Sequence, residues 1–330
     1  MNALETQGLT KGFRQLRGYR DLLLYPLRDD TQLAVDTIDL VIGRGELFGI
    51  LGENGAGKTT LIRMLSTTLI PTAGTALVGG HDVVRDPQAV RRLIGVVSGD
   101  ERTFYMRLTG RQNLEFFAAL YRVPARLAED RIRSLLGALD IEEYADRRFD
   151  AYSTGIRQRF AIARGMLTQP EVLFLDEPTR ALDPIAADEV RSLVAEHVVG
   201  ELGTTVLLAT HTLSEAEAIC HRIGIIRRGR LFASGTMAEL VAGMSLSRVL
   251  DITVRGGPEP LTEAFGRVAG LGDVEVRTDV GRSQASVALG HRLESLTDVL
   301  SAIVSTGVVI ESSTTRQPTL DDVYRAAHAS

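Results

Sequence analysis

The most chemically suggestive part of this 330-residue chain is a glycine-rich loop between an apolar run and an apolar-periodic stretch. Residues 52–60 place one glycine, four residues and then Gly-Lys-Thr, which is the spacing of a phosphate-binding P-loop. Glycines let backbone N–H groups approach phosphate oxygens, and the N-terminus of the following helix adds partial positive charge. The loop residues that we expect to bind a nucleotide are Gly52, Asn54, Gly55, Gly57, Lys58, Thr59 and Thr60.

Two side chains of this loop are predicted to do more than line it. Lys58 reaches the β- and γ-phosphates and supports catalysis, while the Thr59 hydroxyl binds Mg²⁺. A second pair of chemical groups, Asp176 and Glu177, ends the apolar run 172–175. Asp176 is placed to hold the magnesium ion, and Glu177 to orient or deprotonate an attacking water. Taken alone, the acidic pair also fits an exposed turn after a core strand.

A third motif lies between the other two, at residues 152–159. Its sequence, Tyr-Ser-Thr-Gly-Ile-Arg-Gln-Arg, resembles the signature of ATP-binding cassette (ABC) ATPases, which is usually Leu-Ser-Gly-Gly-Gln followed by a basic residue and Gln-Arg. The resemblance implies that Ser153 and Gly155, at a helix N-terminus, close over the γ-phosphate held by another subunit. The chain keeps the family residues Ser153, Gly155, Gln158 and Arg159, and it departs at Tyr152, Thr154 and Ile156.

Three further positions match the same family. Asp183, in Ala-Leu-Asp, resembles the D-loop that crosses the dimer interface, and it can also cap a helix. His211, after the next strand, matches the histidine that contacts the γ-phosphate. Phe13 resembles the aromatic residue that stacks on adenine, with Tyr19 and Tyr25 as competitors and a buried strand position as the alternative.

One family feature is missing from the sequence. The Q-loop glutamine has no counterpart, and counting from either side puts Gly99 or Asp100 in its place, with Glu101 as a further substitute. Residues 104–106, Phe-Tyr-Met, follow at once, in a region that faces the membrane subunit in the family. We expect these side chains either to anchor that contact or to pack in the core.

The elements that must position these motifs alternate between strand and helix, which indicates a mostly parallel sheet with covered faces. A helical stretch interrupts the alternation, and Thr212 with Glu215 fits a capping box. The predicted strands are 36–42, 47–51, 75–78, 92–97, 171–175, 204–209, 223–226 and 230–232. The predicted helices follow the P-loop, recur from about residue 110 to 168, and cover 184 to about 199.

The pattern of predicted strands and helices changes near residue 243. Strands and helices in the order β-α-β-β-α-β, within 249–312, indicate a split, ferredoxin-like unit, and a last helix covers 320–327. The predicted fold is therefore α/β: a P-loop ABC ATPase core with a helical subdomain, plus a small α+β domain. We expect a nucleotide-binding domain at 1–242, with its helical subdomain at about 100–168, and a C-terminal accessory or regulatory domain at 246–330.

Composition narrows the partners and the compartment. Lysine and arginine total 37 against 42 aspartates and glutamates, so the net charge of −5 gives no reason to expect nucleic acid. Cys220 is the single cysteine, which suits a reducing compartment, and no apolar run approaches the ~20 residues of a spanning helix. The segment 11–28 mixes basic and leucine residues, so it is either a membrane-proximal element or a solvated insert.

The resemblance implies an ATP-binding and hydrolysing subunit, with ATP and Mg²⁺ as cofactors, that energises an ABC-2 type exporter of drugs, antibiotics or polysaccharides. Its implied partners are membrane-spanning permease subunits on separate chains and a second ATP-binding subunit, giving a homodimer at the cytoplasmic face of the membrane. A non-transport ABC ATPase acting on ribosomes or DNA is one alternative. In another, the C-terminal domain binds the cargo directly.

Overall fold

The computed structural model describes residues 2–14, 31–98, 104–244, 246, 248–268, 271, 274–279, 281–289 and 294–329. The chain divides into two compact units, Met1–Ser234 and Gly235–Ser330. Sequence predictions for the insert within 15–30, and for Gly99, Asp100 and Glu101, lie outside the described residues. Within those residues, no helix combines the length and the apolar character that crossing a membrane requires.

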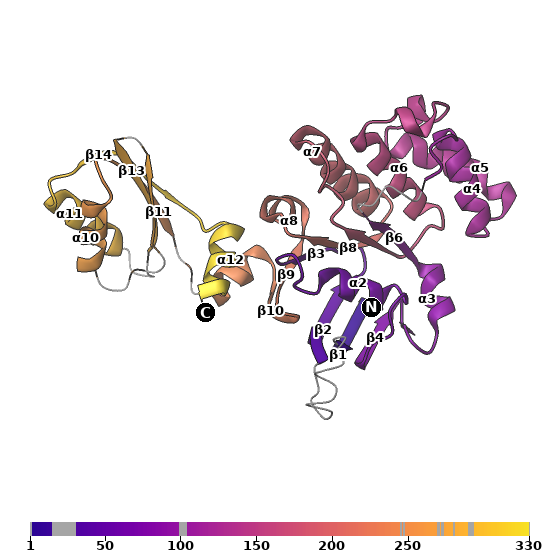
Figure 1. Ribbon diagram of the computed structural model, residues 1–330, viewed down its shortest axis with the longest axis horizontal. Helices are drawn as coiled ribbons and strands as arrows, with labels where there is room; N and C mark the ends of the chain where they lie inside the picture. Colours follow the sequence, from indigo (N-terminus) through magenta and orange to yellow (C-terminus); the bar gives the residue numbers. More distant parts are fainter. Residues whose placement is uncertain are drawn as a thin grey trace, which may run out of the picture. The chain divides into compact units, whose positions relative to one another are not determined.

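The nucleotide-binding motifs belong to the first unit, which contains two sheets (Figure 1). The smaller sheet is antiparallel, in the order β2-β1-β4-β5, and it pairs the long strands β1 and β2 along most of their length. Its strands are β1 (Asn2–Arg14), β2 (Thr31–Gly43), β4 (Ala73–Val78) and β5 (His81–Asp82).

The larger sheet has the order β10-β9-β3-β8-β7-β6, and the neighbouring strands from β9 to β6 are parallel. β3 and β8 are buried at every residue, because helices cover a parallel sheet on both faces. The strands are β3 (Leu47–Leu51), β6 (Ile94–Ser98), β7 (Val172–Asp176), β8 (Thr205–Thr210), β9 (Arg222–Arg227) and β10 (Arg230–Gly235). The accompanying helices are α2 (Lys58–Leu65), α3 (Pro87–Leu93), α7 (Pro184–Leu193), the π-helical η4 (Val194–Glu201) and α8 (Leu213–Ile219).

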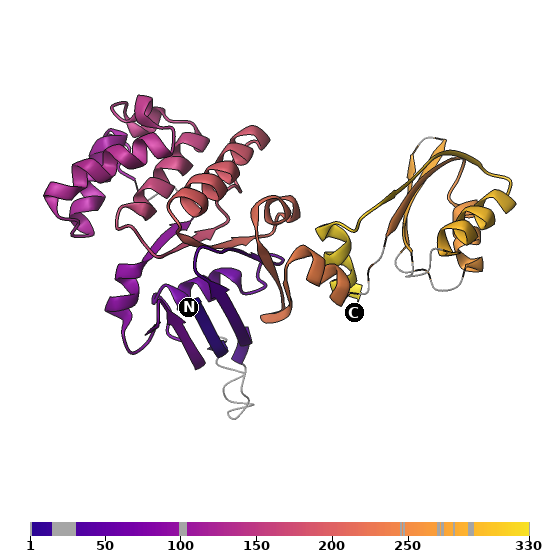
Figure 2. The ribbon, with the colours of Figure 1, turned by 180° about the vertical axis from the view of Figure 1, so that it is seen from behind.

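The predicted helical subdomain is formed by α4 (Gly110–Leu120), α5 (Ala125–Ala138) and α6 (Thr154–Met166), which group together in both views (Figure 2). Two short 3₁₀ helices, Glu142–Tyr144 and Phe149–Ala151, lie between α5 and α6. Aromatic rings fill the interior of this part. The Phe104 ring stacks on Phe149 with 4.4 Å between centroids, and both side chains are buried.

One close backbone contact ties this helical part to the larger sheet. A Cβ atom on Gly95 of β6 would lie 2.3 Å from the Gly165 carbonyl oxygen of α6. A Cβ atom on Gly165 would in turn lie 2.8 Å from Val97 Cγ2, so both positions require glycine. β6 ends at Ser98, which pairs with Asp176 in the parallel register of β6 and β7. Helix α6 is therefore fixed to a strand that ends beside the Asp176-Glu177 motif.

The second unit has the topology predicted for it. Its four antiparallel strands have the order β12-β13-β11-β14, which is the ferredoxin-like arrangement. Leu250, Ile252 and Val254 alternate along β11 and join one apolar core that includes residues of α10 and α11. The elements are α9 (Met237–Gly243), β11 (Val249–Arg255), α10 (Glu259–Arg267), β12 (Val274–Asp279), β13 (Arg282–Ala288), α11 (Glu294–Ser305), β14 (Val309–Arg316) and α12 (Leu320–Ala329).

Charged groups join helix α12 to this sheet. Arg316 donates to Asp251 at 2.7 Å and to Asp322 at 2.5 Å, and its pKa is raised chiefly by the hydrogen bond to Asp322. On the next turn of the helix, Arg325 pairs with Glu275 of β12 and with Asp321. Each guanidinium therefore has two carboxylate partners.

Two local predictions are wrong. The Thr212–Glu215 capping box does not form, because the Glu215 side chain is buried and accepts a hydrogen bond from Thr179 Oγ1 at 2.7 Å. The backbone N–H of Thr212 donates to Thr210 Oγ1 instead. The strand predicted to begin at Arg92 begins at Ile94, because α3 continues through Leu93.

Candidate functional site: a phosphate-binding cavity

A cavity of about 720 Å³ opens where β7 ends and α2 begins. In an open parallel sheet, ligands bind at this carboxyl edge of the strands. Most of the lining residues come from the first two sequence motifs: Asn54, Gly55, Gly57, Lys58, Thr59, Thr60, Asp176 and Glu177. Ala34, Ser98, Arg180 and Ala181 complete the lining.

The loop before α2 has a backbone that only glycine adopts easily. Gly55 and Gly57 have φ angles of 83° and 110°, in the left-handed region. A Cβ atom on Gly57 would lie 2.3 Å from the Ala34 carbonyl oxygen, and one on Gly52 would lie 2.5 Å from that of Ile226. The chain therefore passes tightly beside β2 and β9. The first-turn N–H groups of α2, which have no partner within the helix, belong to residues that line the cavity.

Lys58 is buried at the start of α2. Its Nζ donates to the carbonyl oxygens of Gly52 at 2.6 Å and Glu53 at 3.1 Å, and it lies 3.8 Å from Glu177 Oε1. Burial lowers the pKa of Lys58, and the charges of Glu177 and Asp176 oppose that shift. The ammonium group is thus held by the loop that would surround a phosphate.

Thr59 and Asp176 form a pair of oxygen ligands. The Thr59 hydroxyl donates to Asp176 Oδ1 at 3.2 Å, and burial raises the pKa of Asp176. Hard divalent cations such as Mg²⁺ prefer hydroxyl and carboxylate oxygens, and a cation beside this partly desolvated carboxylate would offset the cost of its charge. The residues present therefore fit the metal that the sequence motif implies.

Glu177 and His211, taken from two separate motifs, are brought together by the structure. Glu177 has a positive φ of 51°, and its backbone N–H donates to the Ala209 carbonyl oxygen at 2.8 Å. Its Oε1 atom lies 3.0 Å from His211 Nδ1. Its Oε2 atom is buried and has no hydrogen-bond donor within the described ranges, although the Arg180 guanidinium lies 3.5 Å away. One carboxylate oxygen of Glu177 is therefore left for another donor.

Several predicted binding residues lie outside the cavity lining. Ser153 caps α6 by accepting from Ile156 N–H at 3.3 Å, and Asp183 caps α7 by accepting from Ala186 N–H at 2.9 Å. A Cβ atom on Gly155 would be 3.1 Å from Ala186 Cβ, so the two helix N-termini lie side by side. Phe13 is 44% exposed, with Lys11 Nζ 5.5 Å from its ring centroid. The nucleotide-binding roles of these residues remain predictions.

Two cavity residues that the sequence motifs did not mark carry polar groups. Ser98 has a weak signal, since it ends a predicted buried strand just as Asp176 does. Arg180 has none, because a single arginine three residues after Glu177 is indistinguishable from a surface charge. Its backbone N–H donates to the Glu177 carbonyl oxygen at 3.3 Å, and this turn brings its side chain to the cavity.

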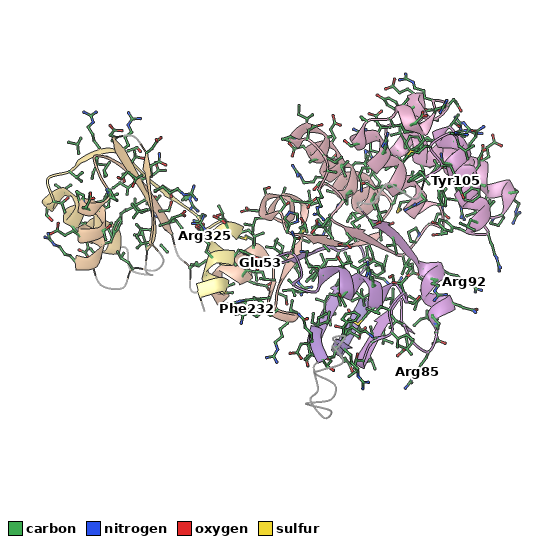
Figure 3. The ribbon with its side chains drawn as sticks, viewed as in Figure 1. Glu53, Arg85, Arg92, Tyr105, Phe232 and Arg325 are labelled. Carbon is green, nitrogen blue, oxygen red and sulfur yellow. The ribbon has the colours of Figure 1, made fainter. Side chains whose placement is uncertain are left out.

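A second cleft of about 710 Å³ shares Thr59, Ser98 and Asp176 with the first. Among the described residues that line it, the positive charges far outnumber the negative ones, since Asp176 is the single acid. A few residues after Ser98 in the sequence, Phe104 is buried, whereas Tyr105, which Figure 3 labels, is 50% exposed. The arginine cleft, as we call it, contains Arg63, Arg91, Arg92, Arg122 and Arg131.

The fold and the cavity together define a P-loop nucleoside triphosphatase. The family model for ABC transporters matches residues 35–180. The chain is 42% identical over 291 residues to a daunorubicin resistance ATP-binding protein, DrrA3, of Streptomyces coeruleorubidus, a match that covers 88% of this chain and 90% of the relative. The chain belongs to the ABC transporter family, and it is an ATP-binding ATPase subunit.

Solved structures agree with this assignment. The structure of CbiO1 from Clostridium perfringens, described as part of the ABC transporter complex CbiONQ, aligns with a TM-score of 0.62 at 28% identity, over 73% of this chain and 91% of that one. A dimeric ATP-binding cassette in a post-hydrolysis state, bound to ADP and Pi, aligns with a TM-score of 0.58 at 23% identity, over 71% and 98%. The second match shows the shared fold. The predicted family and fold class are confirmed.

Proposed function

We propose that this subunit energises an ABC-2 type exporter of amphiphilic drugs or antibiotics from the cytoplasmic face of the membrane. The observation that carries the activity is the pair of Lys58 and Glu177 in the lining of one cavity, with His211 3.0 Å from the Glu177 carboxylate. The export role is supported by the similarity to a relative that is named for daunorubicin resistance and matched over nearly its whole length. The charge of the whole chain gives no support to a nucleic-acid partner.

In this proposal each cavity residue has a separate task. Lys58, buried among loop carbonyls, exchanges those contacts for phosphate oxygens. Thr59 and Asp176 hold Mg²⁺, which neutralises charge on the phosphates when bound. Glu177 orients the attacking water and accepts its proton while His211 fixes the carboxylate. The new bond joins the water oxygen to the γ-phosphorus, the bond to the β,γ-bridging oxygen breaks, and one proton leaves with the products ADP and phosphate.

A second copy of the chain is part of the proposed site. Ser153 and Gly155 do not line the cavity of their own chain, yet Ser153 begins a 13-residue helix whose N-terminal dipole suits an anion. The similarity to a dimeric cassette supports the fold needed for such pairing. We infer a homodimer in which each signature turn completes the cavity of its partner.

Permease subunits on separate chains are the proposed membrane partners. The arginine cleft adjoins the nucleotide cavity, and Tyr105, seven residues after the cleft residue Ser98, adds exposed aromatic surface. A surface with these groups suits a cytoplasmic loop of a membrane protein that bears acidic and apolar residues.

The test is capture of partners from solubilised membranes by the tagged full chain, followed by identification of the bound proteins. We expect a polytopic membrane protein, and we expect Arg92→Glu in the arginine cleft to lose it. Arg85→Glu is the matched control, because Arg85 is exposed and lines neither cavity (Figure 3). Recovery of ribosomal proteins or nucleic acid in place of a membrane protein would contradict the transport role.

A further inference from the structure

Arg180 is the charged side chain of the described cavity lining that the proposed mechanism does not use. It is one of two basic side chains in the described lining, and the other is Lys58. Their surroundings differ sharply, since the side chain of Lys58 is 4% exposed and that of Arg180 is 67% exposed. The cavity therefore has a fixed, buried cation beside the P-loop and a second cation with room to move.

The carboxylate of Glu177 lies between these two cations. Lys58 Nζ is 3.8 Å from Oε1, and the Arg180 guanidinium is 3.5 Å from Oε2. Neither distance is that of a good hydrogen bond, and Oε2 has no hydrogen-bond partner within the described part of the chain. An ion pair of this length with an exposed arginine is weak, so an anion of better geometry can displace it.

Phosphate is an anion of that kind. A guanidinium presents its N–H groups in a planar fork that matches two oxygens of a phosphate, and the resulting hydrogen bonds are charge-assisted. Hydrolysis at this cavity releases a phosphate next to Glu177, whose negative charge repels it. Among the described lysine and arginine side chains within ion-pair distance of that carboxylate, Arg180 is the exposed one.

We propose that Arg180 binds the inorganic phosphate product, forming an anion subsite on the exposed side of the cavity. The inference rests on the proposed hydrolysis of ATP at this site. Before nucleotide binds, Arg180 partly neutralises Glu177. After cleavage it transfers from Oε2 of Glu177 to the phosphate, and it delays release of that product. Arg180 thus has a product-binding role that differs from the role of Lys58.

In the experiment, inorganic phosphate is titrated into the full chain saturated with ADP and Mg²⁺, and its affinity is measured by isothermal titration calorimetry. Because no turnover is required, its result is independent of the ATPase assay. We expect Arg180→Ala to weaken phosphate binding roughly tenfold, as loss of a charge-assisted hydrogen bond implies, with ADP affinity unchanged. Arg180→Lys keeps the charge but loses the fork, so an intermediate affinity is expected. Arg85→Ala, which removes an exposed arginine outside the cavity lining, should match the wild type.

Equal phosphate affinity in the wild type and Arg180→Ala would overturn the proposal, and so would a wild type that binds no phosphate. A parallel loss of ADP and phosphate affinity would also overturn it, because Arg180 would then only shape the cavity. If the chain binds phosphate through Arg180 but hydrolyses no ATP, the proposed function fails and the anion subsite stands.

Discussion

Charged groups in the nucleotide cavity and on the C-terminal sheet are arranged in opposite ways. In the cavity, Lys58 rests on carbonyl oxygens, Asp176 is desolvated, and one oxygen of Glu177 has no hydrogen bond within the described residues. On the C-terminal sheet, Arg316 and Arg325 each pair with two carboxylates. Charges without good partners mark a site that awaits a ligand, whereas mutually satisfied charges mark a structural contact.

The largest effect is expected from Glu177→Gln. The amide cannot accept the proton of the attacking water, so turnover should fall about a thousandfold while ATP binding persists. Because bound ATP would not be consumed, the variant should accumulate as a dimer, measurable by size-exclusion chromatography with light scattering. Hydrolysis at the wild-type rate would show that Glu177 is not the base.

The next largest effect is expected from Lys58→Ala, which should weaken the binding of ATP. Loss of the buried ammonium removes the positive charge nearest the P-loop carbonyls, so ATP affinity should fall about a hundredfold in a fluorescent-nucleotide titration. Arg85→Ala is a suitable control, because Arg85 is exposed and does not line the cavity. Undiminished ATP affinity in Lys58→Ala would remove Lys58 from the binding site.

Asp322→Asn tests how much the paired charges of the C-terminal unit contribute to its stability. Asp322 accepts hydrogen bonds from Arg316 and from the N–H and hydroxyl of Thr319, and its side chain is 15% exposed. We expect the variant to destabilise the C-terminal unit by about 2 kcal/mol, detected as faster hydrogen exchange in 309–327 of the full chain. Unchanged exchange there would mean that these pairs add little to stability.

The pKa of Asp322 determines how the stability contributed by its hydrogen bonds to Arg316 and Thr319 changes with pH. Burial raises the pKa of Asp322, but the hydrogen bonds from Arg316 and Thr319 outweigh it, so the pKa lies below the ordinary value of 3.8. The stabilisation from its ionised form is therefore complete above pH 3.8 and is lost as the pH falls through the lowered pKa. The stability difference between wild type and Asp322→Asn should be constant at neutral pH and shrink in acid.

The smallest effect on stability, and one of opposite sign, is expected from Asp176→Asn. It removes a partly buried charge whose side-chain hydrogen bond, within the described part of the chain, comes from the Thr59 hydroxyl. The nucleotide-free protein should gain up to about 1 kcal/mol of stability while losing magnesium-dependent activity. Thermal unfolding without nucleotide measures the gain, and a loss of stability would show that the Asp176 charge is well accommodated.

Structure is predicted best from the sequence where the residues that form a motif are consecutive along the chain. The strand, loop and helix around Lys58 form one uninterrupted pattern, and the ferredoxin-like order follows from the succession of short elements in the C-terminal unit. The contact between Glu177 and His211 is harder to predict from the sequence, because it depends on the pairing of two neighbouring parallel strands, β7 and β8.

Predictions failed where a side chain has a choice of partners. Glu215 has the right spacing for a capping box, but it turns inward to Thr179, a residue distant in sequence. Arg180 could not be distinguished from a surface arginine, since its importance comes from a turn that brings it to the cavity. Such contacts depend on tertiary packing, which short-range sequence patterns do not encode.

The glycine contact between α6 and β6 has a mechanical consequence. Gly165 acts as a fulcrum, and the helix from there back to Ser153 is a rigid arm of about 18 Å at 1.5 Å per residue. A tilt of about 10° at the fulcrum would carry Ser153 through about 3 Å, roughly the length of a hydrogen bond. Since β6 ends beside Asp176, a slight adjustment near the proposed metal ligands would be magnified at the far end of the arm.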